Sequence, residues 1–279
     1  MINIWLNGSL IDADDAHISP FDHGLLVGDG VFETLRVYDG VPFAWTRHYE
    51  RLVHSGRGLG LGVPDDTVLR PAADSVLDAN QLRAARLRIT VTGGPAPLGS
   101  ERGDTSPTVI VAATALREWP PSETVATVPW PRNERGATAG MKTISYAENV
   151  RALAFAHERG AGEAIFCNTR GELCEATGSN VFVVLDGLVL TPRPDSGCLL
   201  GVTRALVLEL GVEHGIAIEE RTLLPDVLRS ADEAFLTSST REVHPISQVD
   251  DHQLPQVLGP LTKQLAEAFK DLVARDLDP

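Results

Sequence analysis

The sequence predicts an α/β fold with two unlike lobes, and three observations lead to this. Strand-like segments around an Asn-Gly turn, two helical segments and two further strands occupy the first part. Strand and helix patterns alternate in the second part. Between them lies Trp119-Pro120-Pro121-Ser122, whose consecutive prolines can continue neither a helix nor a strand ladder. We therefore expect a small N-terminal α/β domain over residues 1–118, an interdomain linker over 119–127 and a large C-terminal domain over 128–279.

The N-terminal elements follow from turn residues and alternation. Asn7-Gly8 predicts a hairpin turn between strands over residues 2–6 and 9–11. Glycines at positions 24, 28 and 30 allow tight turns before an alternating segment over 31–38, which predicts a strand. Asp39-Gly40 then turns the chain into another strand that ends near Phe43.

Two helices and two strands complete the first lobe. A helix is expected over 46–58, with Leu52 facing inward, and a second from Pro64-Asp65-Asp66 to about residue 80. The glycines over 56–62 are not in GxGxxG register and follow no strand, so we interpret them as a helix exit. Strands over 85–93 and 108–113 enclose a Gly/Pro-rich loop.

The second lobe contains the longer alternation. Strands are expected over 124–128, 163–168, 180–185, 189–191, 216–221 and 233–237, and helices over 147–159, 203–214, 223–230 and 258–276.

Composition limits the classes of function. The chain has 279 residues, 43% of them hydrophobic, enough for one or two domains with a sizeable core. Its net charge of −14 disfavours nucleic acid and anionic membranes as partners, because both repel an acidic surface. The N-terminus does not resemble a signal peptide, and no apolar run approaches the roughly 20 residues of a membrane span. We expect a cytoplasmic protein.

The three cysteines, Cys167, Cys174 and Cys198, are odd in number and lack CxxC spacing. This pattern predicts free thiols in a reducing compartment and no metal site.

Chemistry concentrates in four separated motifs. Lys142 lies in Gly140-Met141-Lys142-Thr143, and Glu175 follows 33 residues later. Small hydroxyl residues recur around Ser179, Thr203 and Thr240, the first two near glycine. An amine, an acid and clustered hydroxyls are the groups that hold pyridoxal 5′-phosphate. A surface lysine and an ordinary helix cap are the alternatives for Lys142 and Thr203 taken singly.

From GDGVFETLR at 28–36 to LTSSTREVHPI at 236–246, the chain resembles the fold-type IV pyridoxal-phosphate enzymes, the class-IV aminotransferase family. This family includes D-amino-acid, branched-chain and (R)-selective amine transaminases and aminodeoxychorismate lyases. The resemblance implies a smaller N-terminal α/β lobe, a larger C-terminal pseudo-barrel lobe, and a homodimer.

The resemblance also implies roles for single residues. Lys142 would hold the cofactor as a Schiff base and then shuttle a proton between the substrate α-carbon and the cofactor. Glu175 would pair with the pyridine nitrogen, with Glu172 as a competitor. Tyr146 would hydrogen-bond the ring oxygen, although a core tyrosine would look the same. The remaining cofactor-binding candidates, most of them around the phosphate, are Arg51, Ser179, Asn180, Gly201, Val202, Thr203, Ser239 and Thr240.

Substrate selection departs from the family pattern. The loop after the strand over 85–93 lacks the Arg-x-His pair of the best-known D-amino-acid transaminases, and Phe32 stands where they have tyrosine. Arg102 is the candidate for a substrate carboxylate, with a solvated loop arginine as the alternative. Thr34 replaces the glycine usual in branched-chain members.

We therefore hypothesise a transaminase that moves an amino group from D-amino acids, and from (R)-primary amines, to a 2-oxo acid. The alternative is an aminodeoxychorismate lyase that releases pyruvate and 4-aminobenzoate. A branched-chain L-amino-acid transaminase is less favoured, and a non-catalytic carrier of the cofactor is disfavoured by the presence of both Lys142 and Glu175.

Overall fold

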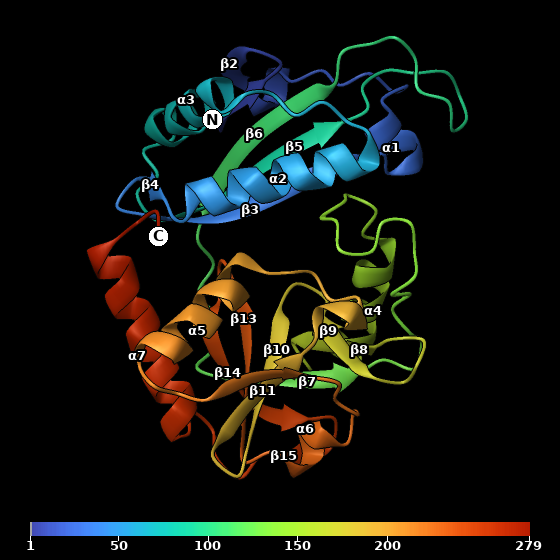
Figure 1. Ribbon diagram of the computed structural model, residues 1–279. Coiled ribbons are helices and arrows are strands. Elements are labelled where there is room, and N and C mark those ends of the chain that lie inside the picture. The colour runs from blue at the N-terminus through green and yellow to red at the C-terminus, as the bar shows by residue number, and fades with distance from the viewer. Residues whose placement is uncertain (1) are drawn as a thin grey trace. The chain divides into compact units, whose positions relative to one another are not determined.

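The structure is a computed structural model that describes residues 2–279, and the chain forms two compact units (Figure 1). The first unit contains the chain up to Arg117 together with Met141–Tyr146 and Asp276–Pro279. The second contains Glu118–Gly140 and Ala147–Arg275. The expected linker over 119–127 is wrong as a linker, because Glu123–Thr127 form strand β7, with Val125 and Ala126 fully buried.

The first unit is built on a sheet that, within residues 2–279, has six antiparallel strands in the order β2-β1-β6-β5-β3-β4. The strands are β1 (Asn3–Leu6), β2 (Ser9–Asp12), β3 (Gly30–Tyr38), β4 (Val41–Pro42), β5 (Ala85–Thr92) and β6 (Thr108–Ala115). The predicted hairpin is confirmed: Asn7 and Gly8, both with positive φ, join β1 and β2.

Two helices cover one face of this sheet, α2 (Trp45–Leu59) and α3 (Asp66–Ala79) (Figure 1). Leu52 of α2 and Leu69 of α3 are fully buried in one apolar core with Leu35 and Leu87 of the sheet. Helix α2 ends where Gly60 adopts a φ of 71°, which confirms the predicted helix exit. A short helix, α1 (His23–Val27), and a 3₁₀ turn over Ala13–Asp15 were not predicted.

The edge of β3 is shared by two partners. Strand β4 pairs with Val37 and Tyr38 near the end of β3, whereas Thr143 bridges to Val31 near its start. The segment Met141–Tyr146 belongs to the first unit because of this pairing. The structure thus attaches the segment that carries Lys142 to β3.

The second unit contains a mixed sheet in the order β12-β11-β10-β13-β14-β7-β8-β9, with β15 paired to β14. In the described chain its strands are β7 (Glu123–Thr127), β8 (Glu163–Cys167), β9 (Leu173–Ala176), β10 (Asn180–Leu185), β11 (Leu188–Pro192), β12 (Ile218–Arg221), β13 (Glu233–Ser238), β14 (Glu242–Val249) and β15 (His252–Gln253). Strand β9 also lies near β10 and β11, so the sheet curls back on itself. This curling confirms the expected pseudo-barrel.

The helices of this unit are α4 (Ala147–His157), α5 (Val202–Glu213), α6 (Val227–Ser230) and α7 (Pro260–Arg275), with a 3₁₀ turn over Pro194–Ser196. Helix α4 packs on β7 and β8, whereas α5 and α7 pack on β13 and on each other (Figure 1). Strands β9, β14 and β15 were not predicted from the sequence. Strand β14 contains Pro245, and a proline normally argues against a strand.

All three cysteines are free, as predicted. Within residues 2–279, no helix combines the length and the apolar character needed to cross a bilayer.

Candidate active site

The backbone of Lys142 is held by two elements of the first unit. Its N–H donates to Oγ of Ser55 on α2, at 3.0 Å, and Ser55 is fully buried. Its carbonyl accepts from the N–H of Phe32 on β3, also at 3.0 Å. The position of the lysine is therefore set by a helix and a strand more than 80 residues away in sequence.

The amine of Lys142 lies beside two aromatic side chains. Nζ is 3.5 Å from the hydroxyl oxygen of Tyr146 and 4.5 Å from the centroid of the Phe32 ring. The two rings meet edge to face, with centroids 5.1 Å apart. Among the predicted residues, Lys142, Tyr146 and Phe32 thus form one cluster.

Arg51 belongs to a buried ion cluster with Glu33 and His48. Its Nε and Nη2 donate to the two oxygens of Glu33, at 2.7 and 2.8 Å, and His48 Nδ1 is 2.7 Å from the same carboxylate. Burial alone would raise the pKa of Glu33, but the guanidinium and the imidazole hold it well below its usual value. The bidentate pair fixes the orientation of Arg51.

Arg102 binds within the first unit. Its guanidinium donates four hydrogen bonds, two to the carboxylate of Asp29 and one each to the carbonyls of Leu59 and Gly60. Hydrogen bonds from Arg102 are the main cause that lowers the pKa of Asp29. A guanidinium has five N–H groups, so little remains for a substrate. The side chain of Arg102 instead connects Asp29, just before β3, to Leu59 and Gly60 at the end of α2.

Arg88 on β5 was missed by sequence analysis. Its guanidinium carbon is 3.8 Å from the centroid of the Phe32 ring, the ring that also contacts Lys142. Burial of the guanidinium lowers the pKa of Arg88, which remains charged at neutral pH. The available signal was the alternation in β5, which puts Arg86, Arg88 and Thr90 on the face away from the core.

Glu175 lies on β9 in the second unit. One of its oxygens accepts from the N–H of Leu199 at 2.9 Å, and the other is 3.5 Å from Nε of Arg132. Arg132, which was not predicted from the sequence, is thus the cation next to Glu175. The competitor Glu172 instead accepts from Arg170 and Asn168 in a turn.

The loop before α5 is shaped by Asn180. Its Nδ2 donates to the carbonyl of Leu199 at 2.7 Å, and its Oδ1 would lie 2.2 Å from a Cβ on residue 201. Only glycine fits there. Gly201 is the N-cap of α5, and no described side chain caps the helix, so the first-turn N–H groups, including those of Val202 and Thr203, are oriented for an anion.

Hydroxyl groups gather at the neighbouring strand ends. Asn180 of β10 is paired with Thr237 of β13, which puts Ser179 beside the turn with Ser239 and Thr240. The hydroxyls of Ser179 and Thr237 are buried and have no hydrogen-bond partner within residues 2–279. Buried hydroxyls of this kind require a partner. Together with the open start of α5, this donor set fits a bound phosphate.

Each unit therefore contains part of the predicted set. Lys142, Arg51 and Tyr146 belong to the first unit, and the other cofactor-binding candidates, from Glu175 to Thr240, belong to the second.

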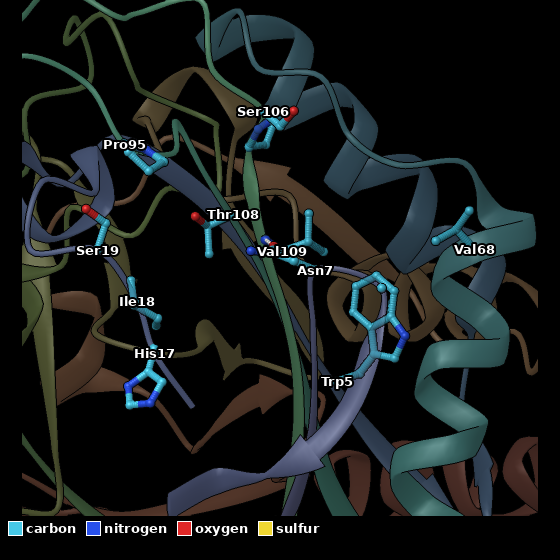
Figure 2. Close-up of a pocket in the computed structure, with 12 residues that line it drawn as sticks. Trp5, Asn7, His17, Ile18, Ser19, Val68, Pro95, Ser106, Thr108 and Val109 are labelled. Atoms are coloured by element: carbon cyan, nitrogen blue, oxygen red, sulfur yellow. Dashed lines mark hydrogen bonds between the residues drawn. The ribbon is translucent and has the colours of Figure 1, made fainter. Parts of the chain in front are cut away.

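A cavity of about 610 Å³ in the first unit has a different character (Figure 2). Trp5, His17 and Thr108 are among the residues that line it, and none of the described lining residues is a lysine, an arginine or an acid. It therefore has no fixed charge for a phosphate or a carboxylate.

Comparison with known proteins identifies the family. The model of the family "Amino-transferase class IV" matches residues 30–249. A protein of Methanocaldococcus jannaschii, provisionally named a branched-chain-amino-acid aminotransferase, is 35% identical over 97% of this chain and 96% of its own length. A D-alanine aminotransferase of Staphylococcus aureus is 31% identical over 98% of both chains.

Solved structures of branched-chain aminotransferases share the fold of this chain. The branched-chain aminotransferase of Escherichia coli has a TM-score of 0.91 at 30% identity, covering 97% of this chain and 94% of that one. That of the archaeon Thermoproteus uzoniensis, solved with norvaline, has a TM-score of 0.87 at 27% identity, with 98% and 94% covered. This chain belongs to the class-IV aminotransferase family and is a pyridoxal-phosphate-dependent aminotransferase.

Proposed function

We propose that this aminotransferase takes its amino group from D-amino acids, and from (R)-primary amines, and passes it to a 2-oxo acid such as 2-oxoglutarate or pyruvate. The observation that carries the proposal is the pair of cations on the Phe32 ring, Lys142 and Arg88. Arg88 can bind a substrate carboxylate where the Arg-x-His pair is absent. The D preference is supported by the 31% identical D-alanine aminotransferase.

The bound cofactor supplies an electron sink for the substrate carbanion. Lys142 holds the cofactor and moves the proton of the substrate α-carbon. Tyr146, whose hydroxyl is 3.5 Å from Nζ, orients the amine. Glu175, held by the N–H of Leu199 and by Arg132, would pair with the pyridine nitrogen of the bound cofactor.

The phosphate is held by backbone N–H groups and by hydroxyls. The proposed donors are the first turn of α5 together with Ser179, Ser239 and Thr240. Arg51, whose guanidinium Glu33 orients, is the candidate phosphate cation of the first unit. Asn180 acts on the loop through the carbonyl of Leu199.

We also propose that the enzyme is a homodimer. Apolar side chains are exposed on α1 and just before it: Ile18, Phe21, Leu25, Leu26 and Val27. A cluster of this kind is typical of an interaction surface, and a second copy of this chain is the occupant that we propose. Light scattering on the purified enzyme and on a Leu25→Asp variant tests this; a monomeric wild-type enzyme would contradict it.

A branched-chain L-amino-acid transaminase is the second candidate, because the M. jannaschii relative is 35% identical over nearly the whole chain. L-amino-acid donors would also need a site for their carboxylate. The two candidates therefore differ in the handedness of the donor.

The deciding experiment mixes the holoenzyme with D-alanine, D-glutamate, L-leucine, L-glutamate, or an (R)- or (S)-amine, without acceptor. Cofactor absorbance and the carbonyl product are measured. We expect D-glutamate and the (R)-amine to react at least tenfold faster than L-glutamate and the (S)-amine, and D-alanine to react as well. Reaction with L-leucine and L-glutamate alone would establish the second candidate, and faster pyruvate release from aminodeoxychorismate would establish the lyase.

A further inference from the structure

The second unit buries a cluster of three charged side chains that the reaction does not require. Glu123, Glu163 and Arg241 are 7%, 3% and 8% exposed. Nη1 of Arg241 is 2.6 Å from Glu123, and its Nη2 is 3.6 Å from Glu163. A Cβ at Gly162 would lie 2.2 Å from the Glu123 carboxylate, so this position must be glycine for the cluster to form.

One side of the cluster reaches the turn that carries Ser239 and Thr240. The guanidinium of Arg241 stacks on the ring of Trp119, 3.8 Å from the centroid, and Trp119 Nε1 donates to the carbonyl of Thr240 at 3.0 Å. Arg241 itself follows Thr240 in the chain, and its N–H donates to Oγ of Ser238. The indole of Trp119 thus holds the turn at Thr240, and the backbone N–H of Arg241 holds it at Ser238.

The other side reaches the turn that carries Ser179. One oxygen of Glu163 accepts from the hydroxyl of Thr177, and also from its N–H at 3.2 Å. The carbonyl of Thr177 accepts from Nδ2 of the buried Asn149. Thr177 is therefore held on two sides, two residues before Ser179.

We propose that Glu123, Glu163 and Arg241, acting through Trp119 and Thr177, position the two turns whose hydroxyls bind the cofactor phosphate. The proposal rests on the phosphate site proposed above. Its physical basis is the rigidity of a buried, hydrogen-bonded ion cluster, which fixes the ends of both turns before the ligand arrives. These side chains are positioning residues, because they act through the turns.

The test removes the two contacts singly. Trp119→Phe keeps a ring under Arg241 but deletes the donor to Thr240, and Thr177→Val deletes the hydroxyl at Glu163 with little change of shape. The dissociation constant for pyridoxal 5′-phosphate is measured from cofactor release by the holoenzyme, without substrate. We expect each variant to bind the cofactor roughly 3- to 10-fold more weakly, the loss of one hydrogen bond. At saturating cofactor, we expect kcat and KM for the donor to stay within about twofold.

Two controls separate positioning from general destabilisation. Trp45→Phe also deletes an indole donor, here to Asp66 in the first unit, and should lower thermal stability without weakening cofactor binding. Thr177→Ser should restore the affinity lost in Thr177→Val, because it keeps the hydroxyl.

Unchanged affinity in both Trp119→Phe and Thr177→Val would overturn the proposal, as would a fall in kcat at saturating cofactor with normal affinity. The donor specificity of the enzyme does not enter these measurements. Failure of the D-amino-acid proposal would appear only in the half-reaction screen.

Discussion

The two units each bury a charged cluster, and the clusters differ in the balance of charge. In the first unit one carboxylate, Glu33, faces the guanidinium of Arg51 and the imidazole of His48. In the second, two carboxylates share the single guanidinium of Arg241. Glu33 and Glu163 are both almost fully buried, at 0% and 3% exposure.

The pKa values of the two acids move in opposite directions. Burial alone raises the pKa of both, but Arg51 and His48 outweigh it at Glu33, whereas Arg241 and Thr177 do not outweigh it at Glu163. Glu33 has the guanidinium of Arg51 to itself, whereas Glu163 shares that of Arg241 with Glu123, and this difference, not the depth of burial, separates the two pKa directions. Glu33 is therefore held more strongly in its charged form than Glu163.

The largest effect is expected from Lys142→Ala, which should reduce activity and leave both charged clusters intact. Amino transfer should fall about 10³-fold or more, because the amine that holds the cofactor and moves the proton is lost. Thermal unfolding should change little, since Ser55 and Phe32 bind the backbone of residue 142. Steady-state rates and calorimetry check this. Lys263→Ala, at an exposed lysine of α7, is the control, and full turnover by Lys142→Ala would exclude the assigned role.

Glu33→Gln tests the first cluster. Removing the carboxylate leaves the buried guanidinium of Arg51 without its counter-charge, so the free energy of unfolding should fall by about 3–5 kcal/mol. Denaturant titration measures this value. A loss below about 1 kcal/mol would mean that the pair contributes little to stability.

Glu163→Gln should lower the free energy of unfolding much less, by about 1 kcal/mol. Its raised pKa shows that the charged form is disfavoured by burial, and Arg241 keeps Glu123 as its partner. The same denaturant titration applies. Equal losses in Glu163→Gln and Glu33→Gln would break the comparison between the clusters.

The smallest effect is a pair of opposite pH slopes. The stabilisation that Glu33 provides over Gln should be present above the ordinary pKa of 4.5 and be lost as pH falls through its lowered folded-state pKa. For Glu163, whose pKa is raised, the contribution should be full below 4.5 and be lost as pH rises through its folded-state pKa. The free energy of unfolding of both variants and of the wild type, measured from about pH 3 to about pH 8, gives the two slopes. Slopes of the same sign would contradict the assignment.

Local patterns predicted much of the fold. Alternation marked β3 and β5, and Asn7-Gly8 marked the first hairpin, because both depend on near neighbours in the chain. Strands β9 and β14 were missed, since β9 has only four residues and β14 contains a proline. These strands form because the sheet around them offers hydrogen-bond partners.

Some residues of the candidate site were likewise predicted from the sequence, and others were not. Lys142 and Glu175 stood out as an amine and an acid in recognisable motifs. Arg88 and Arg132 did not, because an arginine on an alternating strand or in a loop looks like a solvated cation. Arg102 was predicted to bind a substrate carboxylate, but its guanidinium donates to the carboxylate of Asp29, 73 residues away.

The sequence by itself determined the family, the cofactor and the residue types that hold it, because these depend on chemical groups in fixed order. Only the tertiary structure decided which cation contacts which acid, and that Lys142 joins the edge of β3 in the first unit. Such pairings link residues tens of positions apart. Burial and competition among charges select them, and neither is visible in a stretch of neighbouring residues.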